Sequence, residues 1–324
     1  MRVLLALGGN AMSAPDGSAT PQAQQAAIAE AMESVAGLIA AGHQVVITHG
    51  NGPQVGNLLV KNELTASVVP PVPLDWCGAQ TQATIGFTII NALEKSLTRR
   101  GCSASVAAIV TRTRVDEKDP GFANPTKPIG RFRPRDEARK LMKHGQVWQD
   151  RGEKGWRRVV ASPAPLEVLE IRAVLTLMHA GYVVVAAGGG GIPVVRDPGG
   201  GVRGVEAVID KDLTAALFAH SVEADVLVIA TDVENAVTGY GTPAAEAIHT
   251  VSFEEMRELA AAGHFAGGSM GPKVAAAMQF VGQGGQRSVI TSLEHIEASI
   301  TGNFGTVING LVDPSPDSPH SNAR

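Results

Sequence analysis

The chain has 324 residues, which is enough for one large domain or two modest domains with a sizeable core. Hydrophobic residues make up 44% of it and charged residues 18%, a composition typical of a globular protein and not of a disordered one. The net charge of −4 excludes an overall attraction to nucleic acid or to an anionic membrane, so any function that needs positive charge must be local.

The cysteines and the length of the apolar runs indicate the cellular compartment of the protein. Cys77 and Cys102 form neither a CxxC pair nor a disulfide framework, which favours a reducing environment. The apolar start at Val3 is too short for the core of a signal peptide, and no run approaches the ~20 apolar residues of a membrane helix. We therefore expect a soluble, cytoplasmic protein with neither nucleic acid nor a membrane as a partner.

The first elements form a β-α-β unit. The apolar run Val3–Leu7 ends at two glycines, which predicts a buried strand that opens into a tight turn. Thr20-Pro21 starts a helix whose apolar residues recur at helical spacing until Gly42. A second apolar strand follows at 45–48, so the two strands are expected to be parallel with a right-handed crossover.

The same alternation continues along the chain. Helices are predicted from Pro53, over 79–99, from Pro165 and from Pro272, with strands at 105–111, 183–187, 225–230 and 287–291. Ser252 and Glu255 form a capping box that opens one more helix, which ends at Gly263. This order predicts an α/β fold, a three-layer αβα sandwich with a mainly parallel central sheet.

Three of the predicted strands end in glycine-rich turns, at Gly8-Gly9, at 49–52 and at 188–191. Ligands of open α/β sheets bind at the carboxyl ends of the strands, so we expect these turns to converge on one site. Glycine also lets backbone N–H groups approach a ligand closely, which suits a phosphate.

Other familiar signatures are absent or out of context. The chain has no Gly-Lys-Ser/Thr of a Walker A motif, and its histidines never fall at metal-ligand spacing. A GxGxxG pattern occurs at 199–204, but we reject it as a dinucleotide fingerprint because it follows Arg196-Asp197-Pro198 and not a strand, and we expect a loop there.

Two lysines stand where helix N-termini are predicted. Lys211 and Lys273 each begin a helix, where the dipole is already positive, so an anion makes the site favourable. Phosphoryl transfer needs positioning and charge neutralisation more than covalent chemistry, and an anionic acceptor needs no general base. Asp212 would then orient the lysines. The alternatives are surface roles for the lysines and a helix N-cap role for Asp212.

Residues 112–158 hold fourteen of the 27 Lys and Arg residues and interrupt the alternation. We expect an inserted lid subdomain over about 112–160 within a domain of residues 1–312; the alternative is a solvated charged excursion. Residues 313–324, rich in Pro and Ser, are expected to form a flexible tail.

Seven stretches resemble carbamate kinases of the amino-acid kinase superfamily: 6–11, 48–56, 77–82, 124–130, 188–193, 207–212 and 268–273. The resemblance covers essentially the whole chain in order, and the stretches 48–56 and 124–130 are the more specific ones. Two positions depart from the family pattern, Val237 where Tyr is common nearby and Arg133 where a second aromatic residue is common.

The resemblance implies reversible phosphoryl transfer between ATP and carbamate, giving ADP and carbamoyl phosphate, and used toward ATP in the catabolism of arginine or other carbamoyl compounds. It implies Mg²⁺ held mainly through the nucleotide phosphates, and a homodimer. A closing lid would keep water from these labile anions.

Residue roles are carried over by the same resemblance. The catalytic residues would be Lys211, Lys273, Asp212 and Lys127. ATP or ADP would contact Gly8, Gly9, Lys211, Asp232, Tyr240, Ser269, Met270 and Lys273. The carbamate side would be bound by Asn10, Gly50, Asn51, Gly52 and Lys127. Arg114, Arg131 and Arg133 are further candidates to add positive charge from the lid, and the alternative for these three is a surface role.

Two competing hypotheses remain at this point. The first is that the chain is a related kinase with another acid or phosphate as acceptor, and the stretch 124–130 argues against this hypothesis. The second is that the chain is a catalytically silent sensor of nucleotide or carbamoyl phosphate. The presence of Lys211, Lys273 and Asp212 argues against this hypothesis.

Overall fold

A computed structural model of the chain describes residues 1–9, 20–265, 269–302 and 304–310. Its centre is an eight-stranded sheet in which all strands are parallel to their neighbours except β17, which is antiparallel to β16. In spatial order the strands are β15 (Thr250–Ser252), β17 (Thr306–Asn309), β16 (Arg287–Ser292), β12 (Val226–Thr231), β1 (Arg2–Leu7), β2 (Gln44–His49), β9 (Val183–Val185) and β3 (Val106–Ala108).

The alternation of side chains along β1 produces two cores. Leu4 and Ala6 pack on one face of the sheet, whereas Val3, Leu5 and Leu7 pack on the other, and all five are fully buried. Because both faces of the strand are covered, it appears in the sequence as a continuous apolar run.

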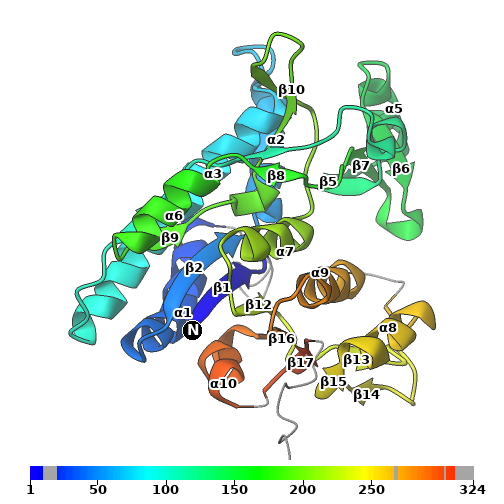
Figure 1. Ribbon diagram of the computed structural model, residues 1–324. Coiled ribbons are helices and arrows are strands. Elements are labelled where there is room, and N and C mark those ends of the chain that lie inside the picture. The colour runs from blue at the N-terminus through cyan, green and yellow to red at the C-terminus, as the bar shows by residue number, and fades with distance from the viewer. Residues whose placement is uncertain (10–19, 266–268, 303, 311–324) are drawn as a thin grey trace, which may run out of the picture.

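Helices cover both faces of the sheet, which makes the three layers of the predicted sandwich (Figure 1). The helices on one side contribute to the core that holds Val3, and they are α1 (Pro21–Ala40), α3 (Leu74–Arg99) and α10 (Ile296–Thr301). The opposite layer consists of α6 (Ile171–His179), α7 (Lys211–Ser221), α8 (Phe253–Ala261) and α9 (Met270–Gly282). The capping box predicted for α8 is present, with both Ser252–Glu255 hydrogen bonds formed.

Smaller elements lie beside the main sheet. A four-stranded sheet contains β11 (Val202–Gly204), β10 (Ile192–Arg196), β4 (Arg112–Arg114) and β8 (Glu167–Val168), and a short hairpin pairs β13 (Val237–Thr238) with β14 (Glu246–Ala247). Helix α2 (Gly52–Thr65) follows β2, and single 3₁₀ turns occur at η2 (Gly152–Lys154), η3 (Gly188–Gly190) and η4 (Leu293–His295).

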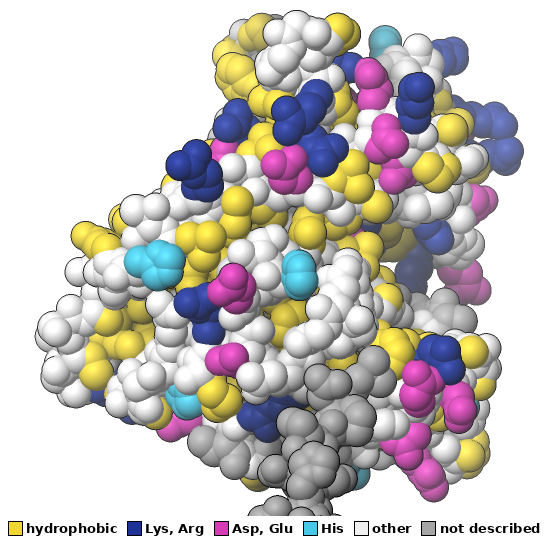
Figure 2. All heavy atoms as spheres, in the orientation of Figure 1, with side chains coloured by type: hydrophobic (Ala, Val, Ile, Leu, Met, Phe, Trp, Pro, Cys, Tyr) yellow, Lys and Arg dark blue, Asp and Glu magenta, His cyan; other side chains and the backbone are white. Residues whose placement is uncertain are grey.

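The basic segment builds a sheet of its own. It contains α4 (Pro120–Ala123), β5 (Lys127–Arg133), α5 (Arg135–Met142), β6 (Val147–Asp150) and β7 (Trp156–Val160), and β7 is the central strand between β5 and β6. Figure 1 places α5, β6 and β7 apart from the main sheet, and Figure 2 shows Lys and Arg side chains gathered on that part of the surface.

The prediction of a helix from Pro165 was wrong for the first turns of that helix. Residues Glu167–Val168 form β8, which pairs with β4, and the helix begins only at Ile171. The backbone N–H groups of Leu166 and Leu169 donate to carbonyls of Arg114 and Arg112, so pairing with a distant strand overrides the local helical pattern.

Other details also differ from the prediction. Helix α3 begins at Leu74 and not at residue 79, and β3 ends at Ala108. The GxGxxG pattern does follow a strand, since the glycines at 199–201 connect β10 to β11 in an antiparallel hairpin. None of the helices in the described part of the chain has both the length and the apolar character that a membrane crossing requires.

Candidate active site

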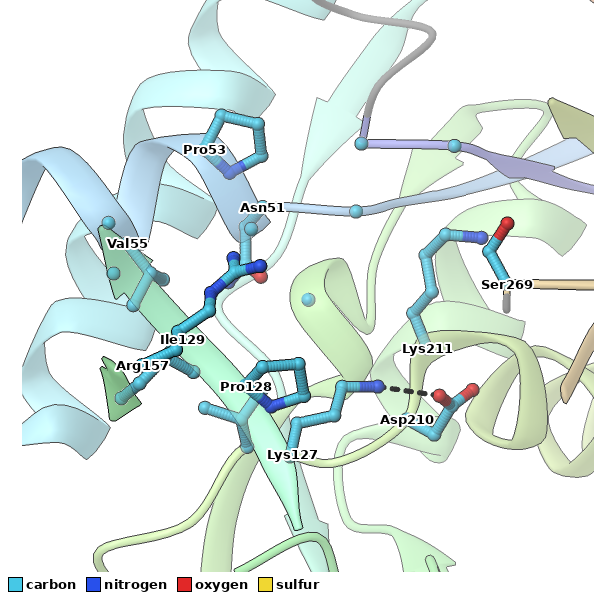
Figure 3. A pocket seen from close by; sticks show the side chains of 18 of the residues that line it. Asn51, Pro53, Val55, Lys127, Pro128, Ile129, Arg157, Asp210, Lys211 and Ser269 are labelled. Atoms are coloured by element: carbon cyan, nitrogen blue, oxygen red, sulfur yellow. Dashed lines mark hydrogen bonds and ion pairs between the residues drawn. The ribbon is translucent and has the colours of Figure 1, made fainter. Parts of the chain in front are cut away.

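The predicted glycine turns meet at one cavity of about 1460 Å³, at the carboxyl ends of β1, β2 and β9. Gly8 and Gly9 follow β1, Gly50 and Gly52 follow β2, and Gly189 follows β9, and all of them line the cavity. Lysines 127 and 211 and Asp210 point into it (Figure 3). The cavity therefore combines backbone N–H donors with cationic side chains.

The turn after β1 and the turn after β2 approach each other closely. A Cβ atom on Gly50 would lie 2.6 Å from the backbone nitrogen of Gly9, and 3.2 Å from Cδ of Lys211. Glycine is therefore required at position 50 because no side chain fits between the two turns.

His49 stabilises the turn after β2 through a hydrogen bond. Its imidazole is fully buried, and Nδ1 lies 2.9 Å from the carbonyl oxygen of Gly50, to which it donates in the neutral form. Burial lowers the pKa of His49 to about 4, against the raising effect of that hydrogen bond, and the positive charge of Lys211 lowers it further. The ring is therefore neutral at pH 7 and acts as a structural donor.

The glycines after β9 are held by side chains from other elements. The amide of Gln82 donates to the carbonyl of Gly188 at 3.0 Å, and the hydroxyl of Thr214 donates to that of Gly190 at 3.1 Å. A Cβ on Gly190 would meet the carbonyl of Ile209 at 2.8 Å. This turn mainly forms the packed floor of the cavity.

Asp212 bridges the two lysines. Its Oδ1 accepts from Nζ of Lys211 and its Oδ2 from Nζ of Lys273 at 3.3 Å, so one carboxylate holds both ammonium groups. Asp212 is only 4% exposed and Lys273 only 7%. Burial raises the pKa of Asp212, but the two ammonium groups outweigh it and hold the pKa below its usual range.

Asp210 performs the capping role that was considered for Asp212. Its Oδ1 accepts from the backbone N–H of Asp212 at 2.9 Å, which caps α7. Its Oδ2 accepts from Nζ of Lys127 at 2.6 Å, an ion pair drawn in Figure 3. Lys127 belongs to β5, so this pair connects the basic segment to the N-terminus of α7.

Comparison with known proteins identifies the family. A model of the amino acid kinase family matches residues 1–292. The carbamate kinase of Pyrococcus horikoshii is 43% identical over 310 residues, which cover 95% of this chain and 98% of the relative. This chain belongs to the carbamate kinase family. Carbamate kinase 1 of Enterococcus faecium is likewise 43% identical over 311 residues, which cover 95% of this chain and 98% of the relative.

Solved structures agree with this assignment. A Giardia lamblia carbamate kinase bound to AMP-PNP superposes with a TM-score of 0.90 at 39% identity, with 96% of this chain and 98% of that chain covered. This carbamate kinase family member thus has the amino acid kinase fold and is a phosphotransferase.

Most residues that the resemblance assigned to the carbamate kinase site line the cavity. They are Gly8, Gly9, Gly50, Asn51, Gly52, Lys127, Lys211, Asp212, Asp232, Ser269 and Lys273. Two do not line it: Tyr240 is 84% exposed beyond β13, and the partly buried Met270 packs against the hydrophobic core. Asn10 lies outside the described residues.

Three residues of the site were not predicted from the sequence. His49 and Asp210 were not assigned roles, although capping residues are recognisable where a helix begins. Arg157, on β7, also lines the cavity. Of the further candidates from the basic segment, Arg114 pairs with Glu167 and Arg133 with Glu63 and Glu137, whereas Arg131 lines the cavity.

Proposed function

We propose that this chain catalyses the reversible transfer of a phosphoryl group between ATP and carbamate, with ADP and carbamoyl phosphate as the other pair. The observation that carries the proposal is the lysine pair held by Asp212 beside the turns at Gly8-Gly9 and Gly50–Gly52 in one cavity. The names of the relatives favour carbamate as the acceptor.

In this proposal the chemistry needs no general base. A carbamate oxygen attacks the γ-phosphorus of ATP, the bond from that phosphorus to the bridging oxygen breaks, and ADP leaves with the electron pair. The attacking oxygen is already anionic, so no proton is removed. Lys211 and Lys273 neutralise the charge on the transferred group, and backbone N–H groups of the glycine turns orient it.

Magnesium is expected as the counter-ion of the nucleotide. No group of three or more His, Cys, Asp or Glu in the described residues is arranged to hold a metal, and Asp210 and Asp212 are both engaged by lysines. Mg²⁺ that keeps most of its waters and binds through the nucleotide phosphates fits such a site. Among the described carboxylates that line the cavity, Asp232 is the one that is not paired to a lysine. When bound, Mg²⁺ neutralises charge between the phosphates.

The basic segment of about residues 112–160 is assigned as the lid of this site, within a kinase domain of residues 1–312. Lys127 would bind the carbamate side from the lid, and its pairing with Asp210 keeps its ammonium group at the cavity. A covering segment protects carbamate and carbamoyl phosphate from water.

A homodimer is part of the proposal. Helix α3 exposes a strip that includes Trp76, Ala83 and Phe87, at 61% and 60% exposure for the two aromatic side chains. These positions recur at helical spacing on the surface, which suits packing against a second copy. We place the enzyme in the cytoplasm, forming ATP during the catabolism of arginine or another carbamoyl donor.

The proposal is tested by following ATP formation from ADP and carbamoyl phosphate with and without Mg²⁺. Acetyl phosphate in place of carbamoyl phosphate is the matched control for the acceptor. We expect rapid Mg²⁺-dependent turnover with carbamoyl phosphate and much slower turnover with acetyl phosphate. Equal turnover with both donors favours a less specific acid kinase, and ADP binding without turnover favours a sensor.

A further inference from the structure

The positive charges of the basic segment fall into two groups. Five of the fourteen Lys and Arg residues between 112 and 158 have a carboxylate partner, namely Arg112, Arg114, Lys127, Arg133 and Arg158. The remaining ones make no ion pair with any described residue. Four of these line the cavity, namely Arg131, Arg151, Lys154 and Arg157.

Arg157 is the most constrained of the four. It lies on β7, the central strand of the three-stranded sheet, between Phe132 of β5 and Gln149 of β6. Its guanidinium carbon lies 5.1 Å from the centre of the Phe132 ring, a cation–π contact. A central strand and an aromatic platform fix the side chain, whereas Arg131, Arg151 and Lys154 are exposed.

The guanidinium of Arg157 is partly buried, and no carboxylate of the described residues forms an ion pair with it. Its Nε is buried and has no hydrogen-bond partner in the described structure. Burial lowers the pKa of Arg157, and the neighbouring positive charge of Arg151 lowers it further. A half-buried cation is costly unless it is paired, so this position favours an anion as its partner.

The direction of the side chain indicates which part of a ligand it would meet. In Figure 3 Arg157 extends into the cavity on the side of Asn51 and Pro53, whereas Lys211 extends on the side of Ser269. Asn51 belongs to the turn proposed for the carbamate side. Lys127, the other lid cation proposed there, is already paired with Asp210.

We infer that Arg157 is a substrate-binding residue of the lid, whose guanidinium binds the carboxylate-type oxygens of carbamate and the carbamoyl end of carbamoyl phosphate. A planar guanidinium suits this role because it presents two parallel N–H donors to two oxygens. The inference rests on the proposed function, because it takes carbamate as the acceptor.

The test compares Arg157→Gln and Arg157→Lys with wild-type protein and with Arg139→Gln. Arg139 lies on α5, is exposed and does not line the cavity, so its replacement controls for the loss of one positive charge from the lid. The measurements are the KM for carbamoyl phosphate, the KM for ADP, and calorimetric titration with carbamoyl phosphate alone.

For Arg157→Gln we expect the KM for carbamoyl phosphate to rise roughly 10- to 100-fold, the range for loss of a hydrogen bond to a charged group. The KM for ADP should stay within about twofold of the wild-type value, because the nucleotide phosphates are assigned to the other side of the cavity. Arg157→Lys keeps the positive charge but loses the paired donors, so a smaller rise, of about threefold or more, is expected.

A KM for carbamoyl phosphate within twofold of wild type in both variants overturns the inference, as does an equal rise in both KM values. Arg157→Lys decides the matter if Arg157→Gln does not fold. If the wild-type protein shows no turnover, the proposed function fails, and the titration decides the inference separately. Binding of carbamoyl phosphate that is lost in Arg157→Gln supports it, and unchanged or absent binding overturns it.

Discussion

Replacement of Asp212 by Asn tests the arrangement of the two lysines with almost no change in shape. The Asp212–Lys273 pair, at 3.3 Å, has an attraction of about 5 kcal/mol at an effective dielectric constant of roughly 20. The Lys211 pair is of the same kind. Removal of the carboxylate charge leaves two neighbouring ammonium groups without their common anion.

The expected consequences are a lower rate and a lower stability. The kcat of Asp212→Asn should fall by about 100-fold or more, because a preorganised charge-stabilising group loses its position. The free energy of unfolding at pH 7 should fall by about 3 kcal/mol, the lower end of the range for breaking a buried ion pair.

The pH dependence of stability gives a separate check. Because the pKa of Asp212 is lowered in the folded protein, the carboxylate contributes stability above its unfolded pKa of about 3.9, and this contribution is lost as the pH falls through the lower folded value. The stability difference between wild type and Asp212→Asn should therefore be present at pH 7 and shrink below about pH 4.

The assay couples ATP formation to hexokinase and glucose-6-phosphate dehydrogenase, and urea unfolding gives the stability. Asp136→Asn, an exposed change in the first turn of α5, is the control for loss of one negative charge. A kcat for Asp212→Asn within threefold of wild type would contradict the orienting role of Asp212, since the lysines would then be positioned without the carboxylate.

Three further predictions concern the turns and the lid. Gly50→Ala places a Cβ 2.6 Å from the nitrogen of Gly9 and should lower kcat/KM by about 100-fold in steady-state kinetics, whereas Gly78→Ala, with open space around its Cβ, should not. Since the folded pKa of His49 is about 4, the unfolded chain binds a proton first as the pH falls. The free energy of unfolding should therefore fall by about 2 kcal/mol between pH 7 and pH 5 because of this residue. In His49→Gln this fall should be smaller, as measured by urea unfolding at the two pH values. Lys127→Ala should raise the KM for carbamoyl phosphate by about tenfold, and an unchanged KM would remove Lys127 from the substrate side.

The parts of the site that the sequence predicts are those carried by local signals. A strand that ends in glycines, as at Gly8-Gly9, is visible in a few residues, and so is a lysine at the start of a helix. The general rule for ligand position in α/β sheets then brings the turns together correctly. The capping box at Ser252 and Glu255 is local in the same sense.

The features that were missed depend on contacts between distant segments. Residues Glu167–Val168 form a strand because β4 is available to pair with them, and no pattern near Pro165 indicates this. The partner of Lys127 lies 83 positions away at Asp210. The pair on β7 shows the same limit, because Arg157 faces the cavity while Arg158 pairs with Glu206, although the sequence presents two equivalent arginines.

The most direct test of phosphoryl transfer through the lysine pair is ATP formation from ADP, Mg²⁺ and carbamoyl phosphate by wild-type protein and by Lys273→Ala at saturating substrates. We expect robust turnover by the wild type and a kcat at least about 100-fold lower for the variant, whose fold is verified by thermal unfolding. Activity near wild type in Lys273→Ala would contradict the role of the lysine pair, and a wild-type protein that binds ADP but forms no ATP would contradict the proposed reaction itself.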